Sequence, residues 1–153
     1  MRLKIVESQE KKLDLLLETI KNLKDDEVKA NLSRFFCIRI SGHLENVLKL
    51  LINNYCEGNS PAPISNYLDK DLKNLTNLSS EKLLKFLKKF SDDWEYRVSE
   101  KLTEEYCSSL NSIISNRNNI AHGQSDNISP KVIEEYYSHL KEIISILKSV
   151  IKK

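Results

Sequence analysis

The sequence predicts an all-α fold of four main helices, with short helices inserted between the second and the third. Only three Gly and three Pro interrupt 153 residues, and the helix-favouring residues Leu, Lys, Glu and Ile recur throughout. Apolar residues follow the i, i+3, i+4, i+7 spacing of one helix face, and no window alternates with the period of two typical of a strand. A chain of this length most often forms one domain, so we expect residues 1–153 to form a single domain.

Long apolar stripes predict the first two helices. The stripe from Leu3 to Leu23 predicts a helix over about residues 3–24, with Lys and Glu on its outer side. Asp25 or Asp26 can cap the next helix, which is expected to run to about Tyr55 and to form the spine of the domain. The predicted core stripe of this second helix consists of Val28, Leu32, Phe36, Ile40, Leu44, Val47, Leu48, Leu51 and Tyr55.

Shorter elements are predicted in the middle of the chain. Residues 58–63 contain Gly, Ser and two prolines, which break the second helix. A short amphipathic piece over 64–75 follows, and the polar stretch 76–80 ends it. Ser80 is the expected cap of a compact basic helix over 81–90, and Ser91 is the expected cap of a short turn that carries Trp94.

Two longer helices complete the prediction. One begins near Thr103 and ends near Gly123, because a glycine commonly follows the last turn of a helix. Its apolar stripe consists of Tyr106, Leu110, Ile113, Ile114 and Ile120. Ser129 followed by Pro130 is a strong start signal for a last helix that runs to the end of the chain.

Charge, hydropathy and cysteine content narrow the function classes. The 24 basic and 22 acidic residues give a net charge of +2, which excludes a polybasic arm and an acidic tail but not a local basic patch. No apolar run approaches the roughly 18 residues of a membrane span, and the N-terminal stretch lacks the apolar core of a secretory signal. The three cysteines, Cys37, Cys56 and Cys107, fit neither a disulfide framework nor a zinc site. We therefore expect reduced thiols, a cytoplasmic location, no membrane contact and no metal or other cofactor.

The segment 117–123, with the sequence Arg-Asn-Asn-Ile-Ala-His-Gly, is the candidate for chemistry. Arg117 continues the apolar stripe of its helix, so a guanidinium stands where apolar surface should be buried. A charge buried without a partner is costly, so Arg117 must be paired, lie at the rim, or face a ligand or a second chain. The alternative is an arginine at the core edge whose stem packs while its head reaches water.

His122 and Asn118 are the other candidates in this segment. Positions five residues apart lie about 140° apart on an ideal helix, so Arg117 and His122 diverge if the helix continues. They can converge if the helix loosens before Gly123, or a symmetric partner can supply the second pair. Asn118 lies beside His122, where an amide can orient an imidazole or hold a phosphate. Alternatively, His122 is a helix-end histidine that interacts with exposed carbonyl groups.

This segment resembles the signature of the HEPN family, which is an Arg, a polar residue, a short spacer and a His. Residues 40–49 are similar to the Leu-Glu-rich helix of the RiboL-PSP-like branch of that family. The resemblance implies a HEPN-like helical bundle and a metal-independent endoribonuclease that works as a homodimer, with Arg117 and His122 of two chains in one cleft. A ribose 2′-hydroxyl would attack its own phosphate, His122 would transfer protons, and Arg117 would stabilise the charge that develops.

The resemblance also implies partners. RNA is the expected substrate, and the expected role is a toxin or an antiviral defence effector with a neutralising antitoxin or a defence-system partner. HEPN toxins paired with nucleotidyltransferase antitoxins carry a Tyr two residues after the His, where this chain has Gln124. Regulation through that tyrosine is therefore not expected. Two alternatives stay open: a catalytically inactive HEPN dimer that binds nucleic acid or protein, and a plain helical interaction protein.

Glu45 and three lysines are secondary candidates. Glu45 lies off the apolar stripe of the second helix, where it either pairs with Lys49 at the surface or orients Arg117 and joins the cleft. Lys85, Lys88 and Lys89 make the short helix basic. They form either a solvated face or a patch that binds RNA phosphates.

Overall fold

The computed structural model describes residues 2–124 and 128–152. The described residues form helices and no strands, which confirms the predicted all-α class. The helices are α1 (Arg2–Asn22), α2 (Asp26–Asn59), α3 (Ala62–Leu72), α4 (Ser80–Phe90), α5 (Asp92–Lys101), α6 (Glu104–Ala121) and α7 (Pro130–Val150). The four long helices α1, α2, α6 and α7 are the predicted main helices, and α3 to α5 are the insertion between the second and the third.

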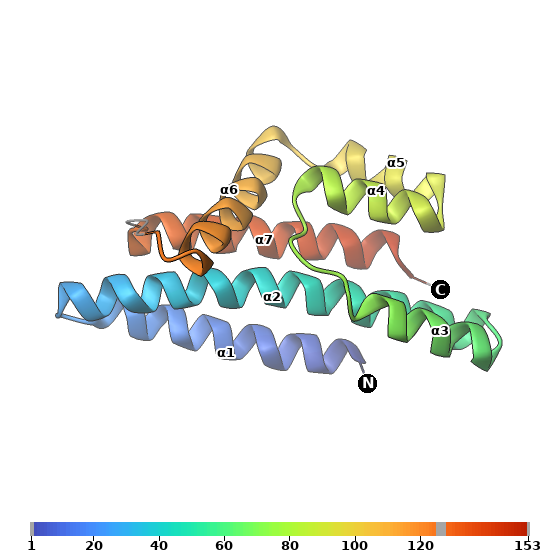
Figure 1. Ribbon diagram of the computed structural model, residues 1–153, viewed down its shortest axis with the longest axis horizontal. Coiled ribbons are helices and arrows are strands. Elements are labelled where there is room, and N and C mark those ends of the chain that lie inside the picture. The colour runs from blue at the N-terminus through green and yellow to red at the C-terminus, as the bar shows by residue number, and fades with distance from the viewer. Residues whose placement is uncertain (1, 125–127, 153) are drawn as a thin grey trace.

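The helix α2 is the spine of the fold. Figure 1 shows α1, α2 and α7 side by side along the long axis, with α6 crossing above α7 and with α4 and α5 paired beside it. The aromatic ring of Phe36 in α2 meets that of Tyr137 in α7 edge-to-face, with centroids 5.3 Å apart. The Tyr137 hydroxyl donates to Asp14 Oδ1 of α1 at 2.6 Å, so side chains of three helices meet at Tyr137. None of the helices in the described ranges is long and apolar enough to cross a membrane.

Side-chain caps begin most of these helices, as the sequence predicts. Asp25 accepts a hydrogen bond from the backbone N–H of Val28, and Ser129 does the same for Val132 ahead of Pro130. The cap of α4 is an exception, because Ser79 and not Ser80 is its N-cap. The backbone N–H of Ser80 instead donates to Asn111 Oδ1 of α6 at 2.9 Å, so the helix begins one residue earlier than expected.

Other details also differ from the prediction: Leu3 of the first stripe is 45% exposed, and α3 begins and ends earlier than the predicted 64–75. Val28 is 43% exposed and lies with Phe35 and Ile38 on the face of α2 that points away from the core, because a straight helix carries its first turn off the line of the later stripe. The helix α2 continues through Gly58 to Asn59 and ends with Ser60 as its C-cap, directly before Pro61. The segment around Trp94 is a ten-residue helix and not a short turn.

Candidate functional site

The helix α6 ends in a hydrogen-bonded reversal that depends on Gly123. The backbone N–H of Gly123 donates to the carbonyl of Ile120, and that of Gln124 donates to the carbonyl of Asn119. This pair of bonds is the Schellman motif, which requires a residue in the left-handed region, and Gly123 has φ of +74°. His122 is therefore the C-cap of α6, held by backbone geometry at a fixed point beyond the last turn.

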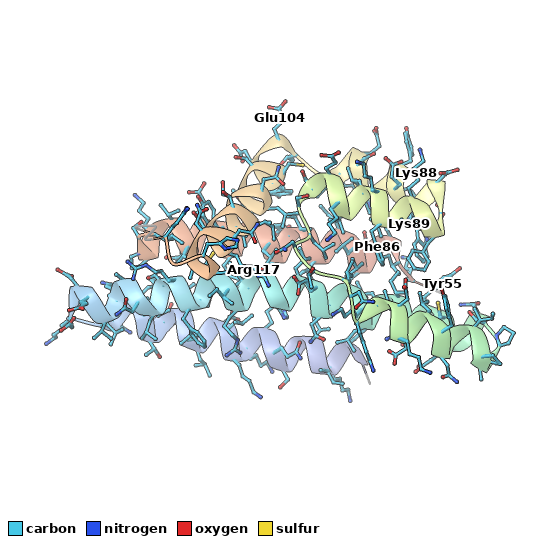
Figure 2. All side chains as sticks on the ribbon, in the orientation of Figure 1. Tyr55, Phe86, Lys88, Lys89, Glu104 and Arg117 are labelled. Carbon is cyan, nitrogen blue, oxygen red and sulfur yellow. The ribbon has the colours of Figure 1, made fainter. Side chains whose placement is uncertain are left out.

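Arg117 lies one turn earlier, where α6 meets α2 (Figure 2). Its side chain is half-buried, and Nη1 donates to the side-chain oxygen of Asn77 in the linker between α3 and α4. The structure thus agrees with a paired arginine at the rim of the core. This bond uses one of the five N–H groups that a guanidinium carries, and a bidentate contact with a phosphate needs two.

Asn77 is held in turn by Glu45. The backbone N–H of Asn77 donates to Glu45 Oε1 at 2.9 Å. Asn77 has φ of +55°, a left-handed conformation that asparagine tolerates better than most residues, so its backbone faces α2 while its side chain faces α6. Glu45, Asn77 and Arg117 form a chain of hydrogen bonds across three elements, which we call the Arg117 brace.

Two roles were considered for Glu45, a surface pair with Lys49 and an orienting role toward Arg117. Glu45 is half-buried, and no ion pair joins it to Lys49 in the part of the chain that the structure describes. Hydrogen bonds instead link Glu45 to Arg117 through Asn77. A carboxylate that fixes the acceptor of a guanidinium restricts where that guanidinium can point.

Asn118 faces a different part of the surface from Arg117. It lines a polar cavity of about 490 Å³ together with Ser79, Asn111 and Ser115. The start of α4 also borders this cavity, where the Ser80 N–H is already bonded to Asn111 and the side chain of Glu81 joins the lining. The lining therefore offers hydroxyl and amide groups beside one carboxylate.

The two motif residues do not meet within one chain. The helix α6 stays regular to Ala121, and the His122 side chain is exposed. Within residues 2–124 and 128–152, no hydrogen bond joins the imidazole of His122 to Arg117 or to any carbonyl. A site that uses both residues on one ligand therefore needs either a ligand long enough to reach both or a second chain.

The remaining candidates lie elsewhere. Lys85, Lys88 and Lys89 are exposed on α4, and Lys85 forms an ion pair with Glu81 at 2.8 Å. In the described residues, histidine, cysteine and carboxylate side chains form no group of three or more that could hold a metal ion.

Sequence reasoning missed Asn77 and the cavity beside Asn118. An asparagine in a polar linker indicates a turn, and that signal was present in residues 76–80. The contact of Asn77 with Arg117 spans 40 positions and follows only from the tertiary packing.

Comparisons with known proteins show to which family the chain belongs. No curated protein and no solved structure matches the chain. The family model described as RiboL-PSP-HEPN matches residues 4–153, which is nearly the whole chain and includes both the Arg117 brace and His122. The chain belongs to the RiboL-PSP-HEPN family, whose HEPN domain indicates a function related to nucleic acids.

Proposed function

We propose that the chain is a metal-independent endoribonuclease that works as a homodimer. The observation that carries the proposal is the Arg117 brace, which holds a guanidinium at the rim of the core one turn before the exposed His122. Three elements cooperate to hold one surface arginine, and preorganised charge of this kind is what a phosphoryl transition state requires.

The reaction requires two functions of the protein, which are proton transfer and stabilisation of the charge that develops on the phosphorane. The 2′-hydroxyl of a ribose attacks the adjacent phosphate, so the RNA itself supplies the nucleophile. His122 takes or gives the proton, since an imidazole exchanges protons near neutral pH. Arg117 offers its remaining N–H groups to the phosphorane oxygens, and Asn118 orients substrate or imidazole without transferring a proton.

An exposed apolar face on α2 supports the homodimer. Val28, Phe35 and Ile38 are 43%, 45% and 38% exposed, and together they make up what we call the α2 face. Ile38 also borders a cavity of 440 Å³ between α1 and α2 that includes Leu13 and Gly42. Exposed apolar side chains on one helix face are typical of a protein interface, and the Arg39 guanidinium lies over the Phe35 ring on this face. A second chain on the α2 face would bring a second Arg117 and His122 into the same assembly.

The role as a toxin or an antiviral defence effector, in the cytoplasm and with a neutralising or defence-system partner, is part of the same proposal. The alternative is a catalytically inactive HEPN dimer that binds RNA or a protein. One observation favours this alternative. His122 and Arg117 lie apart within one chain, so a single chain has no assembled catalytic pair.

The test is RNA cleavage in EDTA by the wild type and by Arg117→Ala and His122→Ala. Loss of general acid–base assistance should lower the rate by about 10²- to 10⁴-fold in His122→Ala. Arg97→Ala and Gln124→Ala are matched controls, because Arg97 forms an ordinary surface pair with Asp93 and the Gln124 side chain is exposed. Cleavage that requires a metal ion, or that survives His122→Ala, would overturn the proposal. RNA binding without any cleavage would favour the inactive dimer.

A further inference from the structure

A groove between α3 and α4 combines aromatic and basic side chains. It has a volume of 460 Å³. Its floor is apolar, with Leu72, Leu75 and Phe86, and Phe90 stands at its edge with 37% of its surface exposed. Three lysines and one aspartate line it, namely Lys82, Lys85, Lys89 and Asp71. We call this feature the α4 groove.

The charges of the α4 groove are not equally available. Lys82 donates to the carbonyl of Thr76, and Lys85 is paired with Glu81. Lys89 forms no ion pair with a carboxylate in the described part of the chain, so its ammonium is the one best able to meet an added anion. Lys88 lies on the same helix but does not line the groove. Figure 2 shows Lys89 and Phe86 on the side of α4 that faces α3, with Lys88 beyond them.

The aromatic rings of the groove are held in place by their neighbours. Phe90 packs edge-to-face on Phe86, with ring centroids 5.2 Å apart, and lies nearly parallel to Trp94 at 6.0 Å. A ring fixed in this way loses little entropy when a flat ligand stacks on it. Aromatic rings next to lysines are the pattern with which proteins hold single-stranded nucleic acid, since bases stack on the rings while ammonium groups meet the phosphates.

The α4 groove adjoins the linker that carries part of the Arg117 brace. The linker 73–79 separates the two features, and Figure 1 shows it passing between α3 and α4. Lys82 contacts this linker at Thr76, and Arg117 contacts it at the next residue, Asn77. One strand of RNA that lies in the groove therefore has only the linker to cross before it reaches Arg117.

We propose that the α4 groove binds the single-stranded RNA that flanks the cut, with one base on Phe90 and its phosphate on Lys89. This inference rests on the proposed function for the choice of RNA, and it adds where the substrate lies and that the substrate is unpaired. Duplex RNA does not fit, because its bases are already stacked on one another and cannot reach Phe90.

Fluorescence anisotropy with a labelled single-stranded RNA carrying 2′-methoxy groups tests the groove without cleavage. Lys89→Glu should weaken binding about tenfold at low salt. It should also reduce the slope of the logarithm of affinity against the logarithm of salt concentration by about one, the change expected for the loss of one phosphate contact. Lys88→Glu is the matched control, with the same charge change on the same helix outside the groove, and should weaken binding only about twofold. Phe90→Leu, which retains apolar bulk, should weaken it about fivefold or more through lost stacking.

Two results would overturn the inference. One is equal weakening by Lys89→Glu and Lys88→Glu, which would indicate a diffuse electrostatic effect. The other is tighter binding of a duplex than of the single strand. The experiments distinguish failure of the groove inference from failure of the proposed ribonuclease function. Cleavage lost in His122→Ala but unaffected by Lys89→Glu would leave a nuclease with another RNA path. Groove-dependent binding without cleavage would leave an RNA-binding module.

Discussion

Acid pH should destabilise this protein through one buried histidine, His43. His43 lies in α2 with 6% of its surface exposed, and its Nε2 has no hydrogen-bond partner among the described residues. Burial is the largest cause that lowers its pKa from 6.5 to about 4, and the positive charges of Lys148 and Arg39 add to it. Asp14 opposes the shift to a lesser extent. The folded protein therefore keeps this imidazole neutral at a pH where the unfolded chain protonates it.

The sign and size of the effect follow from these two pKa values. Above pH 6.5 the imidazole is neutral in both states, and the free energy of unfolding is unaffected. As the pH falls from 6.5 to 4, only the unfolded chain takes up the proton, so the folded state loses stability. The total loss is about 3 kcal/mol, of which about 2 kcal/mol falls between pH 7 and pH 5. The side-chain hydrogen bond and the charge of Lys85 lower the pKa of Glu81 from its ordinary value.

Urea denaturation of the wild type and of His43→Leu at pH 7 and pH 5 measures the effect. Leu has a similar volume and carries no proton, so the variant should lose about 2 kcal/mol less than the wild type between the two pH values. His122→Gln, which replaces an exposed histidine, should keep the wild-type loss. An equal loss of stability in His43→Leu and in the wild type would refute the reasoning.

Three further predictions concern the site and the dimer. Asn77→Gly keeps the left-handed backbone and the bond to Glu45 but removes the acceptor for Arg117, so RNA cleavage should fall about tenfold while the urea midpoint stays close to that of the wild type. Asn77→Ala should add about 1 kcal/mol of backbone strain to the same loss, and unchanged cleavage in Asn77→Gly would show that Arg117 needs no brace. Gly123→Ala should destabilise the protein by about 1 kcal/mol in thermal unfolding, because a side chain is disfavoured at its φ of +74°, and no change would argue against the Schellman ending. Ile38→Lys should give a folded monomer in light scattering at micromolar concentration, and a dimer that persists would place the interface elsewhere than the α2 face.

Much of the fold could be predicted from local signals. Ser129 with Pro130 and Thr103 mark helix starts whose caps need only neighbouring residues, and Gly123 marks a helix end for the same reason. Val28 was assigned to the wrong face because successive steps of four residues drift around the helix, so the first turn lies off the line of the later stripe. The first residue of α4 was missed because it depends on Asn111, which reaches Ser80 from another helix.

The candidate site was predictable only in part. Arg117 was identified because a charge interrupts an apolar stripe, and that is a local observation. The link from Glu45 to Arg117 runs through Asn77 and joins three distant segments, so no spacing in the sequence encodes it. Lys88 and Lys89 are adjacent and chemically identical, and only the packing of α3 against the rest of the fold separates a groove lysine from one outside it.

The most direct test of the central claim is cleavage of an RNA that carries one 2′-deoxy nucleotide at the mapped cut, with EDTA present. The account predicts that the wild type cuts the unmodified RNA and leaves 2′,3′-cyclic phosphate and 5′-hydroxyl ends. The same position should stay intact in the deoxy substrate, because the attacking hydroxyl is gone. Cleavage at the deoxy position, or products with 3′-hydroxyl and 5′-phosphate ends, would contradict the account.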